Sequence, residues 1–271
     1  MKHTIQASLF LAAAVFVLSA CNIVTNLPLA PAQPTAIGTP IIAATSQAPT
    51  PIVEVTFKTP EDAIKYYLDG VAQNDISKIL QACAINEMGE KFKFDLRVER
   101  LGGVMMLGQS LSPTNSSFYS EINRISVSSQ ILNQVKLFTY GLLSSEKVGD
   151  GSPILNVDTE RVNRFIKDVN PSRLANLKIK EIGLPNKKLM NDPKYIENAA
   201  KSASVYGADD STERVALFSF EQSYYYIGFT LLRYGENWKI SSQSSPLSNT
   251  SVLGTPIKIT VEDFESMINN Q

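Results

Sequence analysis

Apolar residues recur at helical spacing over residues 59–142 and at strand spacing over residues 177–240 of this 271-residue chain. The sequence Thr-Pro-Glu-Asp at 59–62 predicts the start of a helix, because a hydroxyl caps free amides, proline suits the first turn and acids oppose the helix dipole. The apolar positions that then share one helical face are Ala63, Tyr66, Tyr67 and Val71. Asn74-Asp75 interrupts the pattern, so we expect a second short helix over residues 76–83.

The middle of the chain, residues 86–170, predicts mostly helices. Alternating polar and apolar residues at 91–98 are the exception and indicate a strand. After Ser116, apolar residues recur at near-helical period, which favours either one long helix or two helices divided by serines at 126–129. These residues are Phe118, Ile122, Ile125, Leu132, Val135, Phe138 and Leu142. Asp158 or Thr159 can cap a further helix. The residues of that helix expected to point inward are Val162, Phe165, Ile166 and Val169.

The second half of the chain carries the clearest strand signals. Residues 174–184 alternate as a strand, and Asp192-Pro193 begins a short helix. Apolar-rich runs at 214–221, 224–234 and 238–242 predict a meander of antiparallel strands. Within the second run, the residues that share one face by the period-two rule are Tyr225, Ile227, Phe229 and Leu231. We therefore expect an α+β fold, in which a curved antiparallel sheet packs on N-terminal helices and a helical insertion occupies the middle.

The N-terminal residues have the features of an export signal. Lys2 precedes an apolar stretch, residues 9–18, that is too short to span a membrane as a helix, which needs about 20 residues. Leu18-Ser19-Ala20-Cys21 then resembles the lipobox of bacterial lipoproteins, which implies cleavage after residue 20 and acylation of Cys21, with chains such as palmitate. The alternative is an ordinary cleaved signal with an incidental cysteine.

The segment after the lipobox predicts a tether. Residues 27–51 contain six prolines and no charged residue, so they favour an extended, disordered chain. We divide the chain into a signal peptide (1–20), a Pro/Thr/Ala-rich tether (21–52) and a single α+β domain (53–271). The expected location is extracytoplasmic, on a bacterial membrane. Where two membranes are present, Asn22 favours the outer one, because Asp at this position often marks retention at the inner membrane.

The order of elements resembles nuclear-transport-factor-2-like domains over residues 59–85 and 213–245. The resemblance rests on the capped first helix, the short helix after Asn74-Asp75 and the late hairpin ending Gly-Glu-Asn-Trp-Lys-Ile at 235–240. It implies a cone-shaped sheet that often leaves an apolar pocket, for which Tyr67, Tyr225 and Phe229 are candidate lining residues. The alternative is that these rings are plain core.

Composition excludes several kinds of chemistry. Without residues 1–20, the chain has 24 basic and 26 acidic residues, and this net charge of −2 gives no support for nucleic-acid binding. The only histidine is His3, so the mature chain lacks the commonest general base and metal ligand. Cys83 would be the sole free thiol, expected to be buried, and no disulfide, metal site or cofactor is expected.

Polar motifs with catalytic precedent are weak. Ser144-Ser145-Glu146-Lys147 matches S-x-x-K, but the companion motifs of penicillin-interacting enzymes are absent. Glu87 with Glu90, and Asp209 with Asp210, are better interpreted as solvated charges. No catalytic residue is therefore assigned.

Two hypotheses for function follow. The first is a membrane-anchored lipoprotein that binds a small apolar or wall-derived ligand, or an envelope protein, without catalysis, and contacts the bilayer through acylated Cys21. The alternative is an isomerase, cyclase or dehydratase that uses a buried carboxylate in the cone. A purely structural envelope protein is not separated from the first.

Overall fold

A computed structural model describes residues 55–108, 110–148 and 151–269, all within the unit Pro51–Gln271. The signal peptide, Cys21 and the tether lie outside the described residues. The helices are α1 (Pro60–Gln73), α2 (Ile76–Gln81), α3 (Ile85–Lys91), α4 (Phe94–Arg100), α5 (Ser117–Leu143), α6 (Thr159–Asp168), α7 (Lys187–Met190), α8 (Pro193–Val205) and α9 (Val261–Asn269). Short 3-10 turns occur at Pro171–Asn176 and Pro246–Ser248. In the described part of the chain, no helix has the length and apolar character to cross a membrane.

The strands form one antiparallel sheet in the order β1-β2-β3-β4, and β5 also pairs with β3. They are β1 (Lys178–Gly183), β2 (Asp210–Phe220), β3 (Ser223–Tyr234), β4 (Asn237–Ser242) and β5 (Ile257–Ile259). β4 pairs with the end of β3 and β5 with its beginning, so the chain between them, residues 243–256, leaves the sheet and returns to it. The predicted α+β fold with its meander and helical insertion is confirmed.

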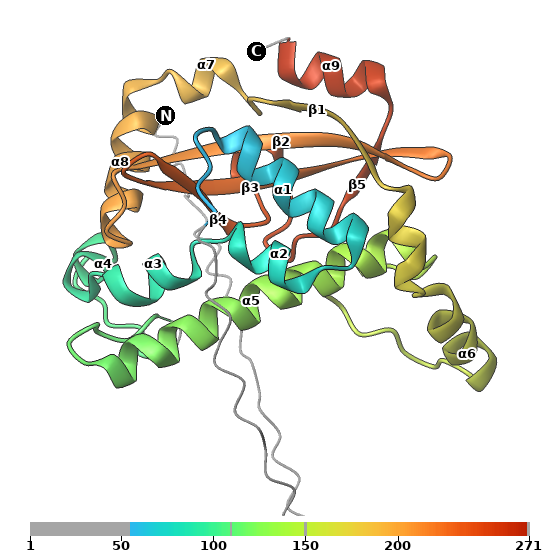
Figure 1. Cartoon of the computed structure of the whole chain (residues 1–271), viewed down its shortest axis with the longest axis horizontal. Helices are drawn as coiled ribbons and strands as arrows, with labels where there is room; N and C mark the ends of the chain where they lie inside the picture. Colours follow the sequence, from blue (N-terminus) through green and yellow to red (C-terminus); the bar gives the residue numbers. More distant parts are fainter. Residues whose placement is uncertain (1–54, 109, 149–150, 270–271) are drawn as a thin grey trace, which may run out of the picture. The chain divides into compact units, whose positions relative to one another are not determined.

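Helices pack on both faces of the sheet (Figure 1). The main core lies between α1 and the face of β2 and β3 that carries Phe218 and Phe229, and α5 closes it with Ile131 and Phe138. A smaller cluster on the opposite face joins Val215 to α9. Its other buried members are Leu217, Tyr226, Phe264 and Ile268.

The helix start and the break after it are as predicted. The Thr59 hydroxyl accepts a hydrogen bond from the Asp62 amide at 3.1 Å, and Pro60 begins α1. Asn74 ends this helix in the left-handed conformation (φ 58°), and the Asp75 carboxylate then caps α2 through the Lys78 amide at 2.9 Å. The Cys83 thiol is buried, as expected, and donates to the Ile79 carbonyl at 3.3 Å.

Two expectations for the middle segment are wrong. Residues 91–98 are not a strand: Phe92 ends α3 and Phe94 begins α4, so the alternation comes from a helix junction. α4 forms because Asp95 lies in its first turn and Arg97 and Arg100 in its last, which suits the helix dipole.

The other wrong expectation concerns which side chains of α6 point inward. Of its apolar residues, Phe165 packs edge-on against Tyr140 with ring centroids 5.2 Å apart, but Val162 and Ile166 are 42% and 64% exposed. The sequence left open whether the segment after Ser116 forms one long helix or two. Residues 117–143 form one 27-residue helix, α5.

Candidate functional site

The interior of the sheet is filled at the place where a pocket was expected. Tyr67 of α1 and Phe229 of β3 are both fully buried, and their rings meet edge to face with centroids 5.6 Å apart. Tyr225 lies near the start of β3, and its ring stacks on that of Phe218 with centroids 6.0 Å apart. The structure therefore brings two of the three candidate lining residues into direct contact in the core and places the third toward the end of the sheet.

A chain of buried amides continues from Tyr67. Its hydroxyl donates to Gln243 Oε1, and the Gln243 backbone N–H donates to Gln134 Oε1 of α5 at 3.0 Å. Gln243 Nε2 donates to the Gly254 carbonyl at 2.5 Å. Burial, and the nearby Cys83, raise the pKa of the Tyr67 hydroxyl, so it stays protonated and acts as a donor. These contacts fix residues 243–256 against α1 and α5.

A buried carboxylate, Glu213 of β2, holds the same segment from the other face of the sheet. It is 7% exposed and accepts hydrogen bonds from the Tyr195 hydroxyl at 3.1 Å, the Ser245 hydroxyl at 2.5 Å and the Leu247 amide at 3.0 Å. Burial and the Glu213 charge raise the pKa of Tyr195, which therefore remains a donor. The sequence contains an indication that Glu213 is buried, because it alternates along the strand with the same period as Val215 and Leu217, which point inward.

Two hollows on the surface are open to solvent. The larger, of about 910 Å³, lies at the β2–β3 hairpin, where it is lined by Lys178, Lys180, Glu221 and Tyr225 among others. The smaller, of about 410 Å³, lies between α1 and β1, and Lys180 lines it as well. Glu213 lines neither hollow. Both hollows are open and have charged residues in their walls, unlike the enclosed apolar pocket that the resemblance implied.

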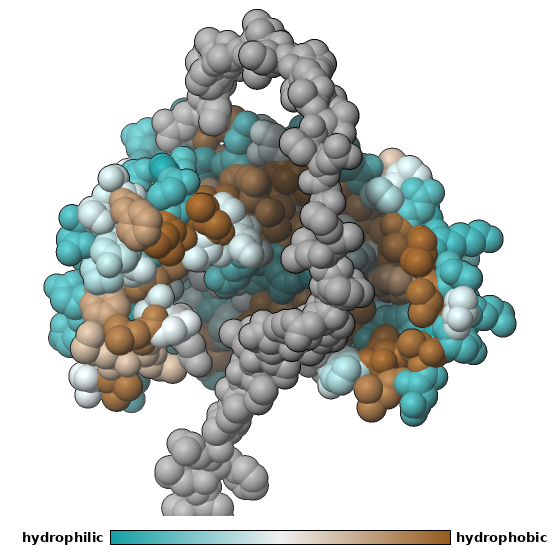
Figure 2. All heavy atoms as spheres, turned by 90° about the horizontal axis from the view of Figure 1, so that it is seen from below, coloured by the Kyte–Doolittle hydropathy of each residue, from teal (hydrophilic) through white to brown (hydrophobic). Residues whose placement is uncertain are grey.

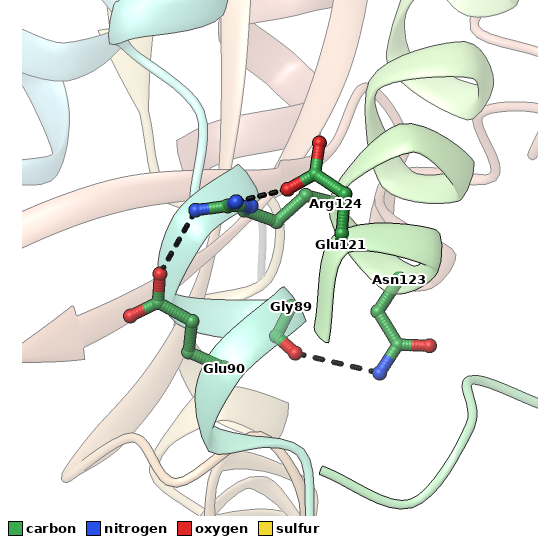
Figure 3. A network of polar contacts seen from close by, with 5 residues as sticks. All are labelled: Gly89, Glu90, Glu121, Asn123 and Arg124. Atoms are coloured by element: carbon green, nitrogen blue, oxygen red, sulfur yellow. Dashed lines mark hydrogen bonds and ion pairs between the residues drawn. The ribbon is translucent and has the colours of Figure 1, made fainter. Parts of the chain in front are cut away.

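The junction of α3 and α5 is held by polar contacts (Figure 3). Asn123, which is 1% exposed, donates from Nδ2 to the Gly89 carbonyl at 3.4 Å. Arg124 lies between two acids: it pairs with Glu90 at 3.1 Å across the junction and with Glu121 on its own helix. A Cβ at Gly89 would lie 2.4 Å from the Arg124 side chain, so the close approach of the helices requires glycine there. Glu90 therefore has a structural partner.

Apolar side chains are exposed at both ends of α5. We call the first group the loop–α5 patch; its exposed members are Val104 (56%), Met105 (58%), Met106 (38%), Leu107 (70%), Phe118 (68%), Tyr119 (42%), Ile122 (38%) and Ile125 (61%). The second group, the α6 patch, comprises Ile154, Leu155, Val157, Val162 and Ile166, each at least 38% exposed. Figure 2, which looks at the domain from below, shows apolar atoms at its left and right sides, the ends at which Figure 1 places α4 and α6.

The weak catalytic motifs have structural partners. The Ser144 hydroxyl accepts from the Glu146 amide at 3.0 Å beyond the end of α5, and Glu146 forms a two-pronged ion pair with Arg161. Asp209 accepts from the Gly235 amide at 2.6 Å, and Asp210 pairs with Arg233 at 3.7 Å. Among the described residues, no group of three or more metal-binding side chains lies together.

Comparison with known proteins supports the fold. No family model and no curated protein matches the chain. Among solved structures, it resembles a cystatin-like protein from Ruminococcus gnavus ATCC 29149, with a TM-score of 0.51 and 19% identity. The match covers 74% of this chain, which spans 44% of the length of that protein. At this identity the likeness shows fold alone: the domain has the α+β architecture of cystatin-like and nuclear-transport-factor-2-like proteins.

Proposed function

We propose that the chain is a bacterial lipoprotein, anchored outside the cytoplasm by acyl chains on Cys21, whose folded domain works by binding rather than by catalysis. The lipobox Leu18-Ser19-Ala20-Cys21 supports the anchor. Two chemical features make the anchor stable: acylation adds more than one chain, and each buried methylene contributes about 0.8 kcal/mol. Asn22 favours the outer membrane where two membranes are present.

The contact between Tyr67 and Phe229 carries the binding half of this proposal. A cone-shaped enzyme needs a cavity for its substrate, whereas here the two buried rings meet between α1 and the sheet. The exposed apolar patches offer a surface for binding instead. A catalytic role for a buried carboxylate is less well supported, because Glu213 already accepts three hydrogen bonds from protein groups and lines neither described hollow.

Mass spectrometry of the N-terminal peptide from bacterial membranes tests the anchor. We expect a chain that begins at Cys21 and carries the mass of a diacylglycerol group, with the protein in the membrane fraction. Cys21→Ser should abolish acylation and release the protein. The matched control is Cys83→Ser, which changes the other cysteine and should leave both properties intact. An unmodified Cys21 thiol, or an uncleaved leader, would overturn the proposal.

A further inference from the structure

The outer side of the first turns of α5 is apolar, although these side chains are exposed. Its buried stripe includes Val127, Ile131 and Phe138. Phe118, Ile122 and Ile125 follow each other at spacings of four and three residues, which places them about 180° around the helix from that stripe. A helix that is apolar on two opposite sides is normally covered on both. The outer side of the first turns of α5 is therefore a candidate contact surface.

The loop before α5 extends the same surface. Val104 to Leu107 are four consecutive apolar residues, between 38% and 70% exposed. They follow Gly102 and Gly103, both at positive φ (66° and 83°), which form the turn after α4. Asn123 ties the returning chain to α5 through both backbone groups of Ser112. Residues 104–107 thus add exposed apolar side chains at the end of the domain where α5 begins.

The two apolar patches are arranged for a broad, shallow contact. They lie at opposite ends of α5, whose 27 residues span about 40 Å. Both ends are visible in one view of the domain (Figure 2). A small ligand does not span this distance, whereas a flat lipid surface touches both patches at once. Exposed apolar areas of this kind mark protein or membrane contacts.

Charge near the loop favours an anionic surface. Segment 90–125, which includes both partners of the Glu90–Arg124 ion pair, contains five basic and four acidic residues, a net charge of +1, although the chain after residue 20 has a net charge of −2. Arg97 and Arg100 lie in the last turn of α4, just before the apolar loop. Basic residues beside an interfacial apolar group strengthen binding to anionic lipids.

We propose that the loop–α5 patch rests on the lipid bilayer, with the α6 patch as a second contact. This inference rests on the proposed acylation of Cys21, which connects the domain to the membrane. From Cys21 to the first described residue there are 34 residues, which reach at most about 120 Å when extended and about 30 Å as a flexible coil. The anchor therefore keeps the patch near lipid continuously, and a patch with weak affinity of its own suffices to hold the domain on the membrane.

A fluorescent label on the apolar loop tests this arrangement in the full acylated chain. Leu107→Cys carries the label, and the protein is incorporated into phosphatidylcholine vesicles with or without phosphatidylglycerol, using brominated lipids as quenchers. We expect a blue shift and strong quenching, greater with phosphatidylglycerol. The matched control is Leu189→Cys on α7, an apolar residue 47% exposed on the far side of the domain from α5 in Figure 1, which should not be quenched. Adding Phe118→Ser and Ile125→Ser should reduce quenching at position 107 several-fold without releasing the protein.

The remaining outcomes distinguish failure of this inference from failure of the proposed anchor. If the acylated chain stays with vesicles but the Leu107 label is not quenched, the inference is wrong and the anchor stands. If mass spectrometry shows no acylation, the proposed function fails. The label is then measured at high lipid concentration on a chain that also carries Cys21→Ser, so that position 107 alone is labelled; quenching supports the patch and its absence refutes it. Protection of the label without vesicles would show that a second copy, or residues 21–54, covers the patch, and would also refute the inference.

Discussion

The carboxamide of Asn123 forms a pair of hydrogen bonds with the backbone of Ser112: Oδ1 accepts from the Ser112 N–H at 2.7 Å, and Nδ2 donates to the Ser112 carbonyl at 2.9 Å. The same Nδ2 donates to the Gly89 carbonyl on α3. One buried side chain therefore joins α3, α5 and the segment that leads from the apolar loop into α5. The position of the loop–α5 patch depends on a polar residue at its back.

Asn123→Asp keeps the shape of this side chain but removes its donors. A carboxylate would face two carbonyls, so we expect the free energy of unfolding to fall by about 2–4 kcal/mol. Urea unfolding followed by circular dichroism measures this loss. Asn191→Asp, at an exposed position after α7, should change stability by less than about 0.5 kcal/mol. Equal effects of the two substitutions would show that the Ser112 contacts contribute nothing.

Gly228→Ala tests the contact between β3 and the segment 243–256. A Cβ at this position would lie 2.4 Å from Thr250 Oγ1 and 2.7 Å from the Ser245 backbone nitrogen, so the segment must move away from the sheet. We expect a loss of about 3 kcal/mol in thermal or urea unfolding. Gly108→Ala is the matched control, because a Cβ there meets no atom within 4 Å, and it should be nearly neutral. An unchanged melting temperature for Gly228→Ala would contradict the close packing.

Glu213→Gln tests whether the buried carboxylate fixes that segment. Glutamine has one acceptor oxygen for three donors and places an NH₂ group against at least one of them, so we expect a loss of about 2 kcal/mol. Hydrogen exchange at the Leu247 amide, which donates to this carboxylate, should become faster. The surface substitution Glu236→Gln, in the β3–β4 turn, controls for the change in charge. An unaltered exchange rate at the Leu247 amide would show that Thr250 and Gln243, rather than Glu213, fix residues 243–256.

The sequence predicted the parts of the fold that local rules determine. Thr59, Asn74 and Asp75 act within one turn of their own positions, and the period-two pattern of β3 marks Tyr225, Ile227 and Phe229 as inward-facing. Such local rules could not predict hydrogen bonds between residues that are distant in sequence. Gln243 bonds to Gln134, 109 residues away, and the polar segment that holds it has no periodicity that could be recognised.

Apolar periodicity also could not distinguish burial from exposure. α5 presents apolar residues at helical spacing on two sides, and Phe138 is buried while Phe118 is 68% exposed. The same ambiguity turned Val162 and Ile166 of α6 inward in the prediction. For the candidate pocket, the sequence identified the correct face for Tyr67 and Phe229, but only the structure reveals that their rings meet edge to face in the core.

Two buried tyrosines should make the fold sensitive to alkali. Burial raises the pKa of Tyr67 and of Tyr234, and both hydroxyls donate hydrogen bonds, to Gln243 Oε1 and the Tyr206 carbonyl. In the unfolded chain a phenol loses its proton near pH 10. Above that pH the unfolded state therefore binds fewer protons than the folded state. The contribution of these two phenols to stability should be constant below about pH 9 and fall as the pH rises further, by at most about 1.4 kcal/mol per pH unit for each phenol. Urea unfolding between pH 8 and 11, with phenolate absorbance recorded in parallel, measures both quantities. Tyr67→Phe with Tyr234→Phe should make this decline less steep without abolishing it, because burial also raises the pKa of Tyr195 and of the Cys83 thiol. Tyr119→Phe, at an exposed position on α5, should leave the decline unchanged. Ionisation of both phenols near pH 10 in protein that remains folded would refute the argument, because their protons would then be no harder to remove in the core than in water.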